Sequence, residues 1–163
     1  MKTIDESEAV KPRVIDRSTW GSGPWDGEPD RVDFRTFDGF AALALRQPMG
    51  HWCGYVAVPP GHPAHGSKDD CIVDVHGGVT YASECAGNVC HVPDDGEPAD
   101  VWWIGFDFSH AYDLIPSTNA AFATLMGSGS RNRDVYRDLT YVRAECEIVG
   151  RQLQDMANAE RKP

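Results

Sequence analysis

The sequence lacks several features that would assign a protein to a class directly. No stretch of roughly 18 apolar residues is present, so we expect no membrane-spanning helix. Residues 1–8 lack the apolar core of a secretory signal peptide. These absences predict a cytoplasmic protein that does not bind membranes.

Motifs of common catalytic and cofactor-binding families are also missing. The sequence contains no Gly-x-Ser-x-Gly, no P-loop and no Gly-x-Gly-x-x-Gly, which argues against a serine nucleophile elbow and a nucleotide cofactor. It contains no His-x-His or His-Glu-x-x-His either, so no established ligand spacing marks a metal site.

Basic residues are few. Lys and Arg number 15 against 25 Asp and Glu, for a formal net charge of −10. Repulsion from phosphate therefore argues against direct nucleic-acid binding. Residues 51–113 hold ten acidic residues and one basic residue, together with all six histidines and four of the five cysteines. Metal ligands and carboxylates that concentrate in this way usually mark a site.

What is present predicts a folded chain. Apolar residues make up 41% of the sequence and tryptophans number five, which is typical of a globule. The 163 residues fit a flexible tail over residues 1–13 and one globular domain over residues 14–163. Residues 20–30 are rich in Gly and Pro, and Trp20 and Trp25 would anchor these turns to the domain.

The strand signals lie in the middle of the chain. Residues 52–58 and 101–108 are rich in aromatic and β-branched side chains and predict strands. Residues 71–75 and 79–82 flank His76-Gly77-Gly78, which predicts a hairpin. Residues 41–46 fit either a strand or a helical turn.

The last third is helical in pattern. Residues 117–126 predict a short helix, and residues 134–158 a longer one with Asp134 as N-cap. One face of the longer helix is apolar and would dock on the sheet or form a dimer seam, so the protein is expected to be a monomer or homodimer. That face contains Leu139, Val142, Cys146, Val149, Leu153 and Met156. The predicted class is α+β: a small, mostly antiparallel sheet of about four to five strands with a long C-terminal helix and one shorter helix.

The strongest candidate site combines four residues, Asp74, His76, Asp107 and His110. Asp74 and His76 would share one face of a strand, and the other two follow the strongest predicted strand. If the strands pair, the four could hold Zn²⁺, Mn²⁺ or Fe²⁺, and a metal with an open position would activate water. His76, His110 and Asp107 are then the predicted catalytic residues. The alternative is that these groups only orient one another or cap turns.

A second cluster contains Cys85, Cys90 and His91. With a fourth ligand it would form a structural zinc site, but the spacing favours a disulfide between the two cysteines, or buried thiols, over zinc. His62 and His65 lie in a loop made rigid by Pro and Gly, where histidines can bind anions or act as general acids.

Four segments resemble a family of small uncharacterised proteins encoded by tailed phages and prophages. The resemblance covers most of the chain from Trp52 onward and implies a phage or prophage origin, with action in the cytoplasm of the host bacterium. It implies no activity, cofactor or catalytic residue. The segments are residues 51–63 (HWCGYVAVPPGHP), 74–81 (DVHGGVTY), 102–113 (WWIGFDFSHAYD) and 136–142 (YRDLTYV).

Three functions fit these observations. The first is a small metal-assisted hydrolase, with His62 and Asp113 at the rim of the site. The second is an acidic protein that binds and inhibits a host defence or nucleic-acid-binding protein. Its acidic patch would imitate phosphate charge and contain Asp94, Asp95, Glu97 and Asp100. The third is a non-catalytic binder of a small molecule.

Overall fold

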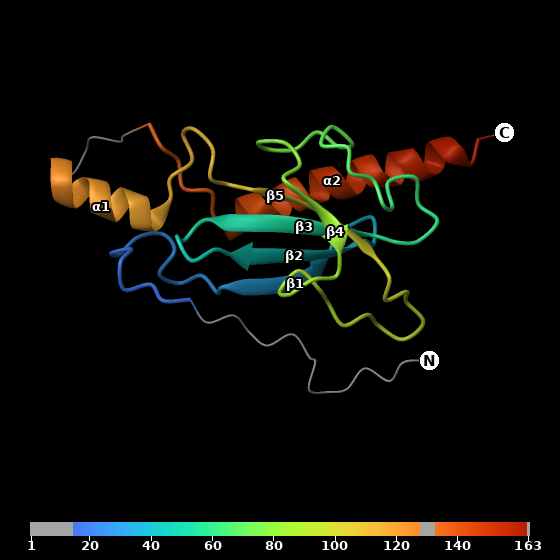
Figure 1. The fold of residues 1–163 in the computed structure, drawn as a ribbon, viewed down its shortest axis with the longest axis horizontal. Coiled ribbons are helices and arrows are strands. Elements are labelled where there is room, and N and C mark those ends of the chain that lie inside the picture. The colour runs from blue at the N-terminus through green and yellow to red at the C-terminus, as the bar shows by residue number, and fades with distance from the viewer. Residues whose placement is uncertain (1–14, 128–132, 163) are drawn as a thin grey trace.

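The structure is a computed structural model that describes residues 15–127 and 133–162, so the predicted tail over residues 1–13 lies outside it. A five-stranded antiparallel sheet forms its centre, with strand order β1-β2-β3-β5-β4 (Figure 1). The sheet and two helices confirm the predicted α+β class. The elements are β1 (Arg31–Arg35), β2 (Ala41–Arg46), β3 (Trp52–Val58), β4 (Tyr81–Glu84), β5 (Trp102–Asp107), α1 (Pro116–Met126) and α2 (Leu139–Glu160).

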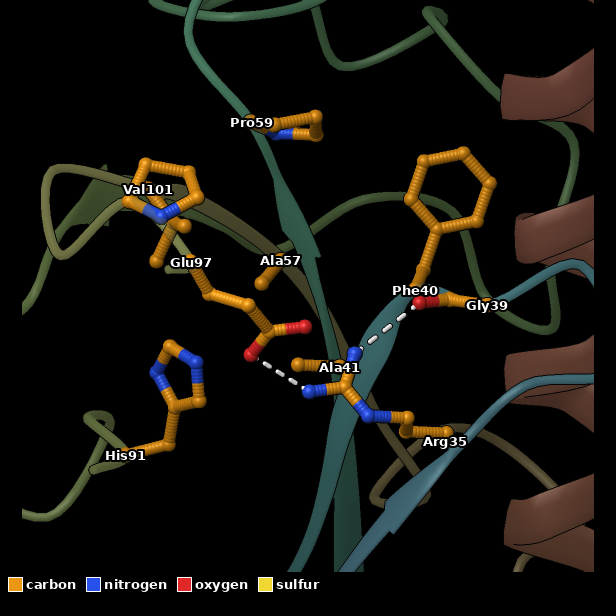
Figure 2. A pocket seen from close by; sticks show the side chains of 10 residues that line it. Arg35, Gly39, Phe40, Ala41, Ala57, Pro59, His91, Glu97 and Val101 are labelled. Atoms are coloured by element: carbon orange, nitrogen blue, oxygen red, sulfur yellow. Dashed lines mark hydrogen bonds and ion pairs between the residues drawn. The ribbon is translucent and has the colours of Figure 1, made fainter. Parts of the chain in front are cut away.

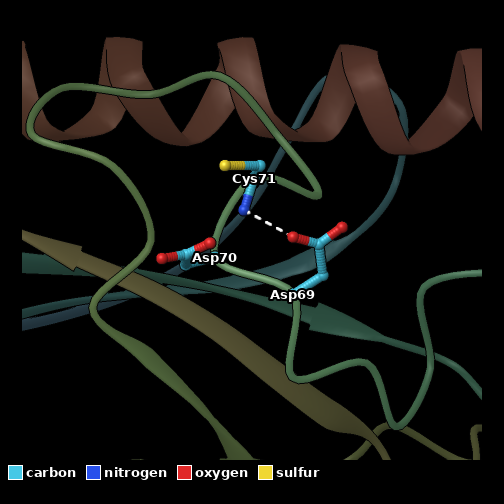
Figure 3. A group of neighbouring side chains, drawn as sticks. All are labelled: Asp69, Asp70 and Cys71. Atoms are coloured by element: carbon cyan, nitrogen blue, oxygen red, sulfur yellow. Dashed lines mark hydrogen bonds between the residues drawn. The ribbon is translucent and has the colours of Figure 1, made fainter.

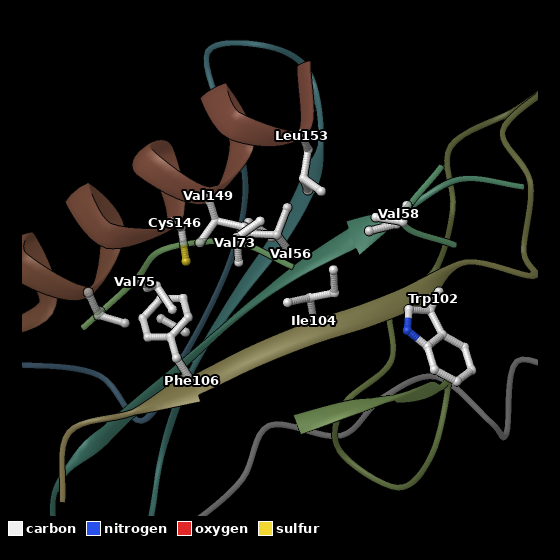
Figure 4. Close-up of a cluster of buried hydrophobic side chains, with 14 of the residues drawn as sticks. Val56, Val58, Val73, Val75, Trp102, Ile104, Phe106, Cys146, Val149 and Leu153 are labelled. Carbon is white, nitrogen blue, oxygen red and sulfur yellow. The ribbon is translucent and has the colours of Figure 1, made fainter. Parts of the chain in front are cut away.

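The long helix α2 covers one face of the sheet, over β2 and β3 (Figure 1). Its apolar residues meet Val56, Ile104 and Phe106 of β3 and β5 (Figure 4). Burial of each such side chain contributes about 1.5–3 kcal/mol, so this contact is a main source of stability. The predicted docking face is confirmed, and its fully buried members are Val142, Cys146, Val149 and Leu153.

The opposite face of the sheet is also buried. Val89 and Val101, from the segment between β4 and β5, pack against the side chains of β2, β3 and β5 there. All seven residues of β3 are buried, which explains why its sequence shows no polar and apolar alternation. The side chains on this face include Leu43, Leu45, Cys53, Tyr55, Ala57 and Trp103.

The turns before β1 are pinned by tryptophans, as predicted. Trp20 and Trp25 are buried, and the Arg46 guanidinium lies 4.3 Å from the centre of the Trp52 ring. The Arg46 side chain is fully buried, and its Nε donates to Asp30 at 3.0 Å. The buried cation is therefore paired and stacked, which a charge at this depth requires.

Two predicted elements were wrong in detail. Residues 71–75 form turns rather than a strand, and the strand that pairs with β5 begins only at Tyr81. Helix α2 begins at Leu139 because Asp138, not Asp134, caps it, accepting a hydrogen bond from the Tyr141 amide at 2.8 Å. The chain before it is extended, since Val135 forms a parallel bridge with Asp113.

Candidate functional site

The structure brings three of the four predicted ligands into one neighbourhood. The ring centres of His76 and His110 lie 6.0 Å apart, and His110 Nε2 is 3.5 Å from Asp107 Oδ1. Asp74 is the exception and corrects the prediction. Residues 71–75 are not a strand, so the strand alternation that would put Asp74 on the face of His76 does not exist; the main chain of Asp74 is bonded to Gln152 of α2.

His76 is held at both ring nitrogens. Its Nε2 lies 2.9 Å from Asp113 Oδ2, and its Nδ1 lies 3.0 Å from the Tyr141 hydroxyl. Because a carboxylate only accepts, Nε2 carries a proton, and in neutral His76 the Nδ1 lone pair accepts from Tyr141. The backbone amide of His76 also donates to Glu145 at 2.9 Å, so the residue is fixed to α2 from two sides.

Asp113 lies at the centre of the site rather than at its rim, where the sequence prediction placed it. Its side chain is fully buried and accepts three hydrogen bonds. The donors are His76, the backbone amide of His110 at 3.1 Å and Arg137 Nε at 3.0 Å. The Arg137 guanidinium balances the buried charge, as a buried carboxylate requires.

Tyr141 and Arg137 are the two site residues that sequence reasoning missed. Tyr141 stands at the start of α2, where its ring meets Phe108 at 5.2 Å and His76 at 5.6 Å between ring centres. The Arg137 guanidinium lies 4.8 Å from the centre of the Tyr141 ring. Burial raises the pKa of Tyr141, so its hydroxyl keeps its proton at neutral pH. The sequence offered one weak indication: neither residue belongs to the apolar face of the predicted helix, so neither was needed to explain how the helix docks.

The turn that carries Asp113 has an unusual backbone. Tyr112 adopts φ 71°, a left-handed conformation that non-glycine residues seldom take. Its side chain is exposed, so no core packing of the ring accounts for the geometry. Its carbonyl accepts from the Val135 amide at 2.7 Å, which ties the turn to the chain before α2. Strain of this kind is often found at functional sites.

Asp107 belongs to a separate hollow next to His110. Burial alone would raise the pKa of Asp107, but hydrogen bonds from Ser109 and Thr80 outweigh it and the pKa is lowered. Ser109 donates twice to Asp107 Oδ1, from its hydroxyl at 2.5 Å and its amide at 3.1 Å. The His110 ring packs against Gly77, where a Cβ atom would lie 2.0 Å from Nε2, so glycine is required there.

Among the described residues, one group of three His, Cys, Asp or Glu side chains has all its donor atoms within 4.8 Å of one another. The group is Asp69, Asp70 and Cys71, and all three residues are exposed (Figure 3). One Asp69 oxygen already accepts from the Cys71 amide at 2.9 Å. The four predicted metal ligands do not form such a group.

The cysteine cluster takes the disulfide form. Cys85 and Cys90 are bonded to each other, with Cα atoms 4.7 Å apart, so their sulfurs are not presented as zinc ligands. The neighbouring His91 packs edge-on against Trp103, with ring centres 5.3 Å apart. Arg31 donates to the carbonyls of Asn88 and Cys90, which fastens this loop to β1.

The two loop histidines hold main-chain atoms. His62 Nε2 lies 2.7 Å from the Leu153 carbonyl, and its Nδ1 accepts from the Ala64 amide at 3.0 Å. His65 Nε2 lies 2.9 Å from the Asp100 carbonyl. Because both nitrogens of His62 are used, this residue joins its loop to α2 and offers nothing to a ligand at the rim.

A further cavity of about 180 Å³ lies beside β2 and β3 on the face opposite α2 (Figure 2). Its walls are mostly apolar, and the Arg35–Glu97 ion pair, with an N–O distance of 2.5 Å, crosses it. The Arg35 guanidinium also donates to the Gly39 carbonyl. The cation of this cavity is therefore already satisfied within the chain.

Comparisons with protein-family models, with curated proteins and with solved structures give no match for this chain. Within residues 15–127 and 133–162, neither helix is both long and apolar enough to span a membrane.

Proposed function

We propose that the protein is a small hydrolase that acts by acid–base and nucleophilic chemistry through Tyr141, His76 and Asp113. The observation that carries the proposal is the placement of His76 between a buried, charge-balanced carboxylate and a tyrosine hydroxyl. A nucleophile, a base and a group that orients the base are thus in hydrogen-bond contact.

The proton positions give each residue a role. His76 Nδ1 takes the proton of Tyr141 as the phenolic oxygen attacks the carbonyl carbon of an ester. Asp113, bonded to Nε2, stabilises the imidazolium that forms. The imidazolium then protonates the departing alkoxide, which leaves an acyl ester on Tyr141. Water, deprotonated by His76, attacks that ester and the C–O bond to Tyr141 breaks. The carboxylic acid is released, and the imidazolium returns its proton to the phenolic oxygen of Tyr141.

Arg137 supports the charged stages. Its Nε anchors Asp113, while the guanidinium lies against the Tyr141 ring and favours negative charge on the phenolic oxygen. The hydrogen-bonded series Tyr141, His76 and Asp113, which we call the Tyr141 relay, needs no metal at His76, since both ring nitrogens of His76 already have partners. We therefore favour this version over the metal-assisted hydrolase that the sequence suggested.

The test uses activated substrates, because p-nitrophenol release reports turnover whatever the natural acyl group is. Purified protein is assayed with p-nitrophenyl acetate and p-nitrophenyl phosphate. We expect hydrolysis of the acetate above buffer, and a loss of about 100-fold or more in kcat/KM in both Tyr141→Phe and His76→Gln. The matched control is Tyr112→Phe, which removes a hydroxyl from an exposed neighbouring tyrosine.

Covalent trapping gives an independent readout. Acid quenching during turnover followed by peptide mass spectrometry should find the acetyl group on Tyr141 in the wild type and not in His76→Gln. The proposal is abandoned if the wild type does not exceed buffer with p-nitrophenyl acetate, or if Tyr141→Phe matches Tyr112→Phe.

The alternative of an acidic protein that inhibits a host protein rests on the exposed Asp95 and Asp100. Two other members of that patch, Asp94 and Glu97, are paired with Arg35, which reduces the unbalanced charge. We rank it second for this reason. Charge reversal of Asp95 and Asp100 should abolish capture of a host partner if this alternative holds. The phage setting suggested by the sequence resemblance is compatible with either function.

A further inference from the structure

A hollow of about 260 Å³ opens on the face of the sheet opposite α2, at the end of β5. Asp107 pairs in register with Cys53, whose side chain belongs to the cluster on that face. The hollow is thus separate from the Tyr141 relay, which lies on the α2 side with Phe108. The sequence prediction named Asp107 as a metal ligand and catalytic residue, but it did not anticipate this hollow.

The charge of the hollow is negative. Among the described residues that line it, Asp107 carries the one full charge. Burial lowers the pKa of His51, partly offset by Asp107 and Asp113, so this imidazole is neutral at pH 7. Burial also raises the pKa of Tyr55, which keeps its phenol neutral. A single carboxylate in neutral, partly buried walls favours a cation.

Two tyrosine rings form an aromatic corner. Tyr55 and Tyr81 stand edge to face, with ring centres 5.3 Å apart and planes at 89°. Both rings line the hollow that also contains Asp107. Rings at right angles can surround an alkylammonium group, because its charge and its adjacent methylenes both interact favourably with aromatic faces.

One wall carries a nitrogen without a partner. His51 Nδ1 is buried and makes no hydrogen bond within the described part of the chain. A buried polar atom left in this way costs free energy unless a ligand or water satisfies it. Ser109 donates twice to Asp107 Oδ1, and the Thr80 side chain donates to the same carboxylate. A carboxylate offers about four lone-pair sites, so it can accept one further donor.

We propose that this hollow binds the primary ammonium group of a small alkylamine. The ammonium donates to the Asp107 carboxylate and to His51 Nδ1, and the first methylenes lie against Tyr55 and Tyr81. A primary ammonium has three donors and a small radius, which suits two acceptors in a hollow of this size. The inference does not depend on the proposed hydrolysis.

The experiment is a titration of the ¹⁵N-labelled full chain with n-butylamine, followed by amide chemical shifts. We expect saturable shifts at residues around the hollow. 1-Butanol, of nearly the same size but uncharged, should bind at least about tenfold more weakly, and tetramethylammonium, which has no N–H donor, should also bind more weakly.

Two variants separate the contribution of the Asp107 charge from that of the tyrosine rings. Asp107→Asn should weaken n-butylamine binding about tenfold or more, and Tyr81→Leu by several-fold. Asp74→Asn, an equal loss of charge outside the hollow, should leave binding unchanged. Equal binding of 1-butanol and n-butylamine, absence of saturable shifts, or unaltered binding in Asp107→Asn would each overturn the proposal. If Asp107→Asn does not give a folded spectrum, the butanol comparison and Tyr81→Leu decide.

Discussion

At the scale of single residues, Asp113 connects three parts of the chain. The turn at residues 110–113, His76 and the segment before α2 all meet at its buried carboxylate. We predict that Asp113→Asn lowers the free energy of unfolding by roughly 2–4 kcal/mol, because Arg137 loses its charged partner and an amide must replace three accepted hydrogen bonds. Urea denaturation measures this.

The control is Asp74→Asn. Asp74 is exposed, and its contacts to Gln152 use the main chain, so the change should stay within about 0.5 kcal/mol. Similar losses in the two variants would mean that the buried position of Asp113 carries no special energetic weight.

Only part of the candidate site could be predicted from the sequence. The proximity of His76 and His110 could be predicted from the sequence. His76 directly precedes two glycines, and His110 follows the end of the strongest predicted strand. Asp113 was misplaced at the rim, since nothing local indicates that a carboxylate after Tyr112 turns inward. Tyr141 and Arg137 could not be found, because their contacts depend on where α2 docks.

At the scale of elements, the structure explains why glycine stands at position 150 of α2, which the sequence alone does not. A Cβ atom there would lie 2.9 Å from Thr36 Oγ1 and 3.0 Å from Thr36 Cβ, so the helix closely approaches the residue that follows β1. Alanine would gain about 1 kcal/mol of helix propensity. We predict that Gly150→Ala is nonetheless neutral or destabilising, because the buried Thr36 side chain has to move.

The reference for that comparison is Ala144→Gly, at an exposed position of the same helix. It should lose about 1 kcal/mol, which is the propensity term alone. Thermal or urea unfolding of both variants separates packing from propensity. A gain near 1 kcal/mol in Gly150→Ala would show that the contact with Thr36 is easily relieved.

The N-cap of α2 gives a second prediction at this scale. Asp138 accepts from the Tyr141 amide and lies at the N-terminal end of the helix dipole. Asp138→Ala should cost about 1 kcal/mol of unfolding free energy, and Asp138→Asn should retain most of it, since asparagine caps well. An equal loss in both would assign the effect to charge rather than to the cap.

The helix itself was predictable from its apolar spacing, but its start was not. Asp134 and Asp138 are both good caps in sequence, and the choice between them depends on the bridge between Val135 and Asp113. The same limit applies to β1, which is short and mostly polar. Its pairing with β2, and not its own composition, makes it a strand.

At the scale of the whole molecule, the disulfide can be separated from a zinc site by counting thiols. Cys53, Cys71 and Cys146 are thiols outside any disulfide, while Cys85 and Cys90 are bonded to each other. Alkylation of the unfolded, unreduced protein should therefore label three cysteines. Reduction should lower the unfolding free energy by about 2 kcal/mol, the loop-closure value for a short loop. Five labelled cysteines before reduction would contradict the bond.

Acid stability depends on groups that lie on the face of the sheet opposite α2. Burial holds the pKa of His51 and of His91 below the usual 6.5, so the unfolded chain binds more protons than the folded one just below that value. Stability is then complete above about pH 6.5 and falls as the pH decreases through the histidine range. Asp107, whose pKa is lowered, adds a further loss below its usual 3.8. Urea midpoints between pH 8 and pH 4 should show the first decline beginning near 6.5, and His51→Gln should flatten it. A midpoint that stays constant down to pH 5 would mean that neither buried imidazole resists protonation.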